Sequence, residues 1–284
     1  MSSVATFESQ QLKRDIERFL DEDDFFKHPL YFSKLPRHEV EAQLFIKSDL
    51  TLAGTPWFEA TFDFLGYPLK SLKEWEGQQL KKGTQIKLND GIPFAVALTA
   101  ERVALNLLQR ASAVATHTKK FVDIAQKYNI KILDTRKTTP GLRNLEKYAV
   151  VQGGGFNHRM GQTDLWMIKD NHKKCFGGVK EAMDFFQGLQ AFYTPIEVEI
   201  HDLKELDTAM KLGVRHMMLD NFSLDQLKAA LLVKQPDVTY EISGGVTLEN
   251  LESYCLKGID AISVGALTHS APSVDISFKY EIKK

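Results

Sequence analysis

The sequence has only two cysteines, Cys175 and Cys255, among its 284 residues. They lie far apart and match no metal-ligand spacing, so we expect two reduced thiols, as in a cytoplasmic protein, and no disulfide framework. The formal net charge of −1 provides no global field that would attract nucleic acid or a membrane surface. No apolar stretch is long enough to span a bilayer, and residues 1–20 lack the apolar centre of a signal peptide.

The N-terminal part of the chain combines helical and strand-like patterns. Residues 7–20 place Leu12, Ile16 and Leu20 at helical spacing, which predicts an amphipathic helix. Residues 39–88 contain short strand-like runs, VEAQLFIKS, PWFEATFDFL and GTQIKLN, separated by turn residues. Residues 93–109 again favour a helix. We therefore expect residues 1–112 to form a small α+β sandwich domain, joined by the C-terminal tail 273–284.

Residues 113–272 alternate helix-like segments with six short apolar runs: KILDT, LWMIKD, IEVEI, HMMLD, YEISGG and AISVGA. This alternation predicts a parallel α/β structure. An open doubly wound sheet and a closed barrel both fit the pattern. Polar residues follow all six predicted strands, and active-site residues of barrels come from the carboxyl ends of many strands. We therefore favour an α/β barrel catalytic domain over an open sheet.

Several basic residues follow the first two of these strands. Arg136 and Lys137 come after KILDT, His158 and Arg159 follow a glycine run, and Lys169 ends LWMIKD. If the strands are neighbours, up to five cations point into one cavity and would suit a ligand with several negative charges. The alternative is that each is a solvated surface residue.

Acidic residues occupy the next two strands. Glu197 and Glu199 share one face of IEVEI, where a buried carboxylate needs a partner, and Asp220 ends the following strand. Glu199 and Asp220 are candidates for binding Mg2+, directly or through its waters, or ribose hydroxyls. The alternative is a structural ion pair with one of the cations, and Glu197 is expected to have that role. We treat the remaining histidines as structural: His117, His172, His201, His216 and His269 among them.

Small residues end the last two strands, at Ser243–Gly245 and Val264–Ala266. In barrels the loops after the last strands commonly bind phosphate through backbone N–H groups, although tight turns would also explain the glycines. Arg102 is different, because it lies in the predicted helix of the first domain. Its neighbours suggest a surface arginine paired with Glu101 or Asp90.

Long motifs of this chain closely resemble the quinolinate phosphoribosyltransferase family. They include TAERVALNLLQRASAVAT, DTRKTTPGLRNLEKYAVVQGGGFNHRMGQTD, IKDNH, IEVEI, MLDNF, SGGV and ISVGALTHSAPSVDIS. The matches extend from about Leu52 to Ser277 in the order found in the family. The resemblance implies an incomplete α/β barrel, a smaller N-terminal sandwich, and a dimer or multiple of dimers.

The resemblance also implies a reaction, quinolinate plus phosphoribosyl pyrophosphate giving nicotinate mononucleotide, pyrophosphate and CO2, in NAD biosynthesis. Alternatives are a molybdate-transport-associated relative and a non-catalytic sensor of a phosphorylated metabolite. In the implied site, quinolinate is bound by Arg136, His158, Arg159 and Lys169, with Arg102 from the neighbouring subunit. Phosphoribosyl pyrophosphate and Mg2+ are engaged by Lys137, Glu199 and Asp220, which are the candidate catalytic residues. The remaining candidate substrate-binding residues are Thr135, Ser243, Gly244, Gly245, Val264, Gly265 and Ala266.

Overall fold

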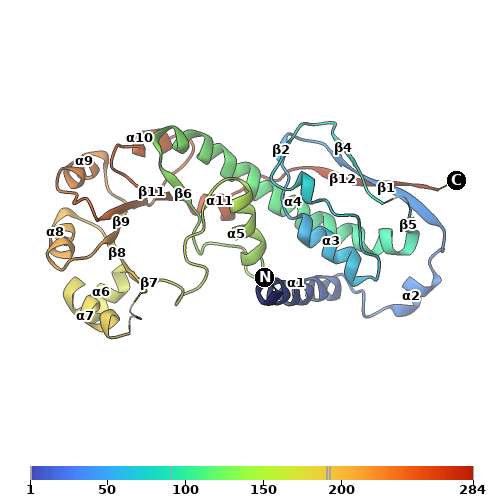
Figure 1. Ribbon diagram of the computed structural model, residues 1–284, viewed down its shortest axis with the longest axis horizontal. Helices are drawn as coiled ribbons and strands as arrows, with labels where there is room; N and C mark the ends of the chain where they lie inside the picture. The colour runs from blue at the N-terminus through green and yellow to red at the C-terminus, as the bar shows by residue number, and fades with distance from the viewer. Residues whose placement is uncertain (1, 90, 190, 192, 284) are drawn as a thin grey trace. The chain divides into compact units, whose positions relative to one another are not determined.

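The structure is a computed structural model that describes residues 2–89, 91–189, 191 and 193–283, with the side chains of residues 2–9 left out. Contacts divide the chain into two units (Figure 1). The first comprises Met1–His117, Asn144–Gly153 and Ala271–Lys284, and the second comprises Thr118–Arg143 and Gly154–Ser270. The first unit continues five residues past the boundary expected after residue 112, and the tail 273–284 belongs to it. The sequence did not suggest that residues 144–153 also group there.

The first unit combines helices with a small antiparallel sheet. Its helices are α1 (Ser2–Glu22), α2 (Pro29–Lys34), α3 (Thr55–Phe64), the first part of α4 (Phe94–Ala125) and α5 (Arg143–Gln152). Its strands are β1 (Glu39–Ile46), β2 (Leu50–Thr51), β3 (Gln79–Leu80), β4 (Gln85–Lys87), β5 (Ile92–Pro93) and β12 (Ile276–Ile282). Strand β1 pairs antiparallel with β12, β4 and β5, whereas β2 pairs with β3. The C-terminal strand is thus built into the first unit.

Alternation along β1 positions the core of this unit. Val40, Ala42, Leu44 and Ile46 are buried at every second position, as the sequence pattern predicted. They belong to one apolar cluster that also contains residues of α3 and α4. The core therefore lies between the β1 sheet and these two helices.

One predicted strand is wrong. The run PWFEATFDFL forms most of helix α3 instead, with Pro56 in the first helical turn, where its missing N–H costs nothing. The buried positions Thr55, Phe58, Thr61 and Phe62 follow helical spacing of three and four residues. Phe and Thr favour strands intrinsically, but burial of one helical face outweighs that preference.

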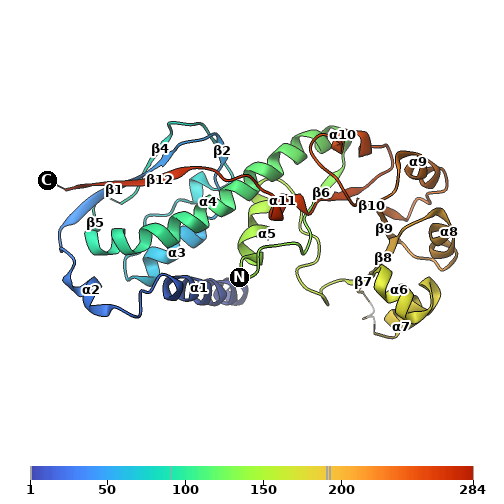
Figure 2. The same cartoon turned by 180° about the vertical axis from the view of Figure 1, so that it is seen from behind.

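The second unit alternates strands with helices. Its strands are β6 (Lys131–Leu133), β7 (Trp166–Ile168), β8 (Ile196–Ile200), β9 (His216–Asp220), β10 (Thr239–Ser243) and β11 (Ala261–Ser263). Its helices after β7 are α6 (Asp170–Phe176), α7 (Val179–Leu189), α8 (Leu203–Lys211), α9 (Leu224–Leu232), α10 (Leu251–Tyr254) and α11 (Ala266–His269). All six predicted strands are confirmed. Figure 2 shows α8, α9 and α10 on the outer side of this curved sheet.

The strand order distinguishes a barrel from an open sheet. The order is β6-β11-β10-β9-β8-β7, with parallel pairing throughout, so the first and last strands of the series are neighbours. That closure is typical of a barrel, whereas a doubly wound sheet reverses its order at an internal point. Phe156, in the segment between β6 and β7, forms an isolated parallel bridge with Leu133 of β6. The prediction of an incomplete barrel is confirmed.

Candidate active site

A chain of charged side chains crosses the carboxyl ends of β7, β8 and β9. Lys169, directly after β7, places its Nζ 2.7 Å from Oε2 of Glu199. His201 lies between two carboxylates, with its Nε2 3.2 Å from Oε1 of Glu199 and its Nδ1 3.7 Å from Oδ2 of Asp220. The structure therefore brings together three of the residues predicted from the sequence. It adds His201, which we expected from the sequence to be structural.

These residues also fit a divalent cation. Ligand atoms of Glu199, His201 and Asp220 lie within 4.8 Å of one another. Carboxylate oxygens are the donors that Mg2+ prefers, and it commonly retains several waters. The sequence also allowed Glu199 a structural role as the partner of a basic residue, and the structure pairs it with Lys169. A bound cation would therefore compete with Lys169 for this carboxylate.

The turn after β10 lies beside Asp220. Ser243 is the residue paired with Asp220 across the β9–β10 ladder, and its carbonyl accepts a hydrogen bond from the Asn221 N–H at 2.8 Å. Gly244 has φ +99, and a Cβ there would lie 2.9 Å from the Asn221 backbone nitrogen. Only glycine fits this close approach between two strand-end loops. A Cβ added to Gly245, which has φ +61, would meet no atom within 4 Å.

Lys137 lies over the turn that follows β11. A Cβ on Gly265 would meet the Lys137 side chain at 3.0 Å, and Thr268 Oγ1 donates a hydrogen bond to the Lys137 carbonyl at 2.8 Å. Thr135 Oγ1 accepts from the Lys137 N–H at 3.0 Å, which shapes the loop after β6. Lys137 and Gly265 are therefore neighbours, as expected if both contact one phosphorylated ligand. Val264 is buried and donates its N–H to the carbonyl of Leu133, and Ala266 begins α11.

Two of the predicted arginines lie close enough to influence each other. Burial lowers the pKa of Arg159, and the positive charge of Arg136 lowers it further. Nη1 of Arg159 donates hydrogen bonds to the carbonyls of Gln162 and Leu165, at 3.1 and 3.0 Å. Arg136 is exposed. Two guanidinium groups that repel each other are stabilised when an anion binds between them.

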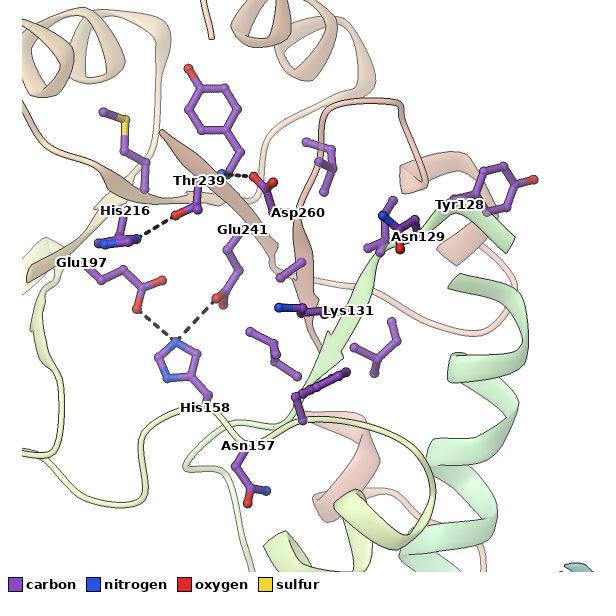
Figure 3. Close-up of a pocket in the computed structure, with 18 of the residues that line it drawn as sticks. Tyr128, Asn129, Lys131, Asn157, His158, Glu197, His216, Thr239, Glu241 and Asp260 are labelled. Atoms are coloured by element: carbon purple, nitrogen blue, oxygen red, sulfur yellow. Dashed lines mark hydrogen bonds and ion pairs between the residues drawn. The ribbon is translucent and has the colours of Figure 1, made fainter. Parts of the chain in front are cut away.

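His158 points away from these strand ends. Figure 3 shows its imidazole directed into the barrel, toward Glu197 of β8 and Glu241 of β10. These three residues line a cavity of about 1090 Å³. The cavity is also lined by residues at the amino ends of strands, such as Lys131, His216 and Thr239, so it opens at the end opposite to Glu199 and Asp220.

Burial and charge shift the pKa values inside this cluster. Burial, with the negative charge of Glu197, raises the pKa of Glu241 to about 8. Burial lowers the pKa of His158, but the hydrogen bond and charge of Glu197 and the charge of Glu241 outweigh it, so that pKa is raised overall. The sequence pattern predicts Glu197 as a partner for a cation but does not single out Glu241. Glu241 lies between the core residues Tyr240 and Ile242 along β10, and this alternation is the signal that could have identified Glu241.

Arg102 lies in the first unit, exposed on α4. Within the described residues no ion pair joins Arg102 to Glu101, while Asp90 lies outside the described residues.

No described helix is long and apolar enough to cross a membrane.

Comparison with known proteins agrees with this arrangement. Residues 114–279 match the model of the quinolinate phosphoribosyl transferase C-terminal domain, and residues 29–112 match that of the N-terminal domain. The chain is 40% identical to a probable nicotinate-nucleotide pyrophosphorylase [carboxylating] of Bacillus subtilis over 268 residues, 94% of this chain and 92% of that protein. It is 38% identical to the human nicotinate-nucleotide pyrophosphorylase [carboxylating] over 249 residues, 86% of this chain and 83% of that protein.

Solved structures agree as well. The crystal structure of NadC from Streptococcus pyogenes superposes with a TM-score of 0.86 at 33% identity, covering 96% of this chain and 99% of that one. The nicotinate-nucleotide pyrophosphorylase of Francisella tularensis gives a TM-score of 0.86 at 30% identity, covering 96% and 97%. Both domain models match, and the match to the Bacillus subtilis relative covers 92% of that protein. The chain therefore belongs to the quinolinate phosphoribosyltransferase family.

Proposed function

We propose that this protein transfers the phosphoribosyl group of phosphoribosyl pyrophosphate to quinolinate, with loss of CO2, and so makes nicotinate mononucleotide for NAD biosynthesis. The gathering of basic side chains around the Glu199–Asp220 pair at one end of the barrel carries this assignment, because the two substrates together bring many negative charges. The curated relatives bear the name of this activity. The molybdate-associated and sensor alternatives are not favoured.

Quinolinate has two adjacent carboxylates, and the basic residues fit them. Arg136 and Arg159 repel each other, and a carboxylate between them would relieve that repulsion through planar, bidentate hydrogen bonds. Lys169 would exchange its contact with Glu199 for a contact with the substrate once a cation occupies the Glu199 side. Binding in this way holds the pyridine nitrogen toward the ribose.

Phosphoribosyl pyrophosphate would lie across the turns after β6, β10 and β11. Gly244, Gly245 and Gly265 allow backbone N–H groups to approach its 5′-phosphate, and Lys137 adds a point charge toward the pyrophosphate. Glu199 and Asp220 would hold the ribose hydroxyls or Mg2+. When bound, Mg2+ supplies positive charge against the pyrophosphate.

The bond changes need no protein nucleophile. The pyridine nitrogen attacks the anomeric carbon while the bond from that carbon to the pyrophosphate oxygen breaks, and Lys137 stabilises the departing charge. Glu199 or Asp220, near the ribose, stabilises positive charge that develops on the ring. The positive charge of the new pyridinium then stabilises the electron pair left at carbon 2 when the carboxylate on that carbon leaves as CO2, and a proton from solvent adds to carbon 2 to complete the product.

The same assignment extends to assembly and location. Arg102 is exposed on α4 and would serve the active site of a neighbouring subunit in a homodimer or multiple of dimers. The two cysteines, Cys175 and Cys255, are both free thiols, which supports the proposal of a cytoplasmic enzyme.

The test is direct. Purified protein is incubated with phosphoribosyl pyrophosphate, Mg2+ and quinolinate labelled in its 2-carboxylate, and labelled CO2 and nicotinate mononucleotide are measured. We expect equal amounts of both products, loss of turnover with a chelator, recovery with Mg2+, and poor use of nicotinate, which has one carboxylate. Equal turnover of nicotinate and quinolinate, or full activity in chelator, would contradict the substrate and metal assignments respectively.

A further inference from the structure

His201 comes directly after β8, and its imidazole lies between the carboxylates of Glu199 and Asp220. Its Nε2 is buried and makes no hydrogen bond with any residue that the structure describes, although Oε1 of Glu199 lies 3.2 Å away. Its Nδ1 lies 3.7 Å from Oδ2 of Asp220. A buried ring nitrogen without a hydrogen bond costs free energy. This arrangement therefore suits an ion that the imidazole and the carboxylates bind together.

The separations between these side chains are those of ligands around one metal ion. Ligand atoms of Glu199, His201 and Asp220 lie within 4.8 Å of one another. Two ligands at about 2.1 Å from one octahedral ion, bound at right angles, lie about 3 Å apart. The 3.2 Å between Nε2 of His201 and Oε1 of Glu199 is close to that spacing. Lys169 contacts the other oxygen of Glu199, Oε2, so Oε1 is the oxygen that faces the imidazole.

Hydrogen bonds fix the backbone that carries two of these ligands. Nζ of Lys173, on α6, donates to the carbonyl of Glu199 at 2.8 Å and to Oε2 of Glu205 at 2.6 Å. The same carboxylate oxygen of Glu205 accepts the N–H of His201 at 2.9 Å. Lys173 is buried. Side chains that extend from a fixed backbone lose little freedom when they bind an ion, so the site is arranged before the ion arrives.

The imidazole affects which cation this site prefers. Mg2+ binds oxygen ligands and keeps several of its waters, whereas an imidazole nitrogen is a ligand for first-row transition ions. Mn2+ accepts both kinds of ligand. A set of one imidazole and two carboxylates therefore favours Mn2+, while Mg2+ would use the carboxylates and water.

We propose that His201 is a third protein ligand of the divalent cation at the carboxyl ends of β8 and β9, and that it makes this site prefer Mn2+ to Mg2+. The inference deepens the proposed function and rests on it for the presence of a cation at Glu199 and Asp220. With three protein ligands, the cation is bound by the protein before phosphoribosyl pyrophosphate arrives.

The first experiment detects the nitrogen ligand directly. Mn2+ alone is titrated into the full-length protein, and pulsed electron paramagnetic resonance records modulation of the Mn2+ signal by bound nitrogen. We expect nitrogen modulation in the wild type, a changed pattern when histidine is labelled with the heavy nitrogen isotope, and no modulation in His201→Gln. Failure to bind Mn2+, or Mn2+ bound without nitrogen modulation in the wild type, would overturn the proposal.

The matched control is His216→Gln. His216 begins β9 at the opposite end of the barrel, where its Nδ1 lies 2.8 Å from Oγ1 of Thr239. This variant should bind Mn2+ with the same nitrogen modulation as the wild type. Modulation that survives in His201→Gln but disappears in His216→Gln would assign the nitrogen to the wrong histidine for our proposal.

The second experiment compares the two ions by calorimetry. We expect the wild type to bind Mn2+ at least about tenfold more tightly than Mg2+. His201→Gln should weaken Mn2+ binding by at least about tenfold, because changing even the outer partners of metal ligands alters affinity by about 10–100-fold. Its Mg2+ affinity should change by less than about threefold, since Mg2+ uses oxygen ligands. Equal losses for both ions would mean that His201 shapes the site without binding the ion.

Turnover by the wild type separates this inference from the proposed function. An enzyme that makes nicotinate mononucleotide with Mg2+, but shows no nitrogen modulation with Mn2+, would overturn the role of His201 alone. A protein that shows the modulation, but forms no product with either ion, would keep the metal site and overturn the proposed function.

Discussion

Glu241 lies inside the barrel with Glu197, His158 and Ser263 beside it, and its pKa is raised to about 8, chiefly by burial. An unfolded glutamate titrates near pH 4.3, so between about pH 4.5 and 8 the folded protein binds the extra proton. The free energy of unfolding should therefore fall as pH rises through this window. Glu241→Gln removes this contribution, so its stability relative to wild type should rise by on the order of 2–4 kcal/mol across the window. Urea unfolding at several pH values measures it.

The matched control is Glu249→Gln, because Glu249 is exposed and its pKa is lowered by a hydrogen bond from Thr247. A lowered pKa affects stability only at acidic pH, so this variant should follow wild type from pH 5 to 8. If wild type and Glu241→Gln show the same pH dependence, Glu241 is ionised in the folded protein at neutral pH.

Lys137 allows a sharper test of charge stabilisation. Its side chain lies against Gly265, where we place the phosphorylated substrate. Lys137→Ala should lower kcat by about 10²–10³-fold, as is typical when one group that stabilises departing charge is removed. Lys211→Ala, which removes an exposed lysine paired with Asp207 on α8, should leave kcat unchanged. If the Lys137→Ala enzyme instead has a normal kcat and a raised KM for phosphoribosyl pyrophosphate, Lys137 binds the substrate and the transition state equally well.

Among single residues, the sequence predicted those whose position depends on strand alternation alone. Glu199 and Asp220 follow from a carboxylate at a strand end, and Glu197 from sharing a face with Glu199. The direction of His158 could not be predicted, because it lies in an irregular loop whose path depends on Asp134 and on the register of β8 and β10. Contacts between strands that are far apart in the sequence depend on how the strands are aligned, and a single sequence does not reveal this register.

At the scale of elements, the barrel strands were predictable because each is a short apolar run flanked by a helix and a turn residue. The first unit was harder. Its run PWFEATFDFL satisfies both an alternating and a helical pattern, and packing of Phe58 and Phe62 in the core selects the helix. The grouping of residues 144–153 with the first unit depends on tertiary contacts, such as the ion pair of Arg110 with Glu146.

The turn after β10 gives a prediction at this scale. Gly244→Ala should raise the KM for phosphoribosyl pyrophosphate at least about tenfold and lower the melting temperature, because φ +99 is strained for alanine and its Cβ would collide with the Asn221 backbone. Enzyme kinetics and thermal unfolding measure both effects.

Gly245→Ala is the matched comparison. It meets open space at φ +61, so its cost should be limited to about 1–2 kcal/mol of backbone strain, without displacing Asn221. Equal effects of the two substitutions would show that backbone strain alone, and not the contact with the β9 loop, makes glycine necessary in this turn.

At the scale of the whole molecule, Arg102 indicates how subunits would share a site. It is exposed on α4, where its guanidinium could reach a second copy of the chain. Arg102→Ala should leave the melting temperature nearly unchanged, because an exposed helical position tolerates alanine. Its kcat/KM for quinolinate should fall by about 100-fold or more, as expected when a charged clamp on a carboxylate is lost.

Subunit mixing decides whether Arg102 acts on the neighbouring subunit. Arg102→Ala and Lys137→Ala homodimers should each be nearly inactive. In a mixed dimer, one site contains an intact Lys137 and receives an intact Arg102 from its neighbour, while the other site lacks both. Random exchange makes about half of the dimers mixed, so about a quarter of wild-type activity should return. Native mass spectrometry establishes that exchange has occurred. Exchange without recovered activity would mean that Arg102 serves its own subunit or has only a structural role, and the shared-site proposal would be wrong.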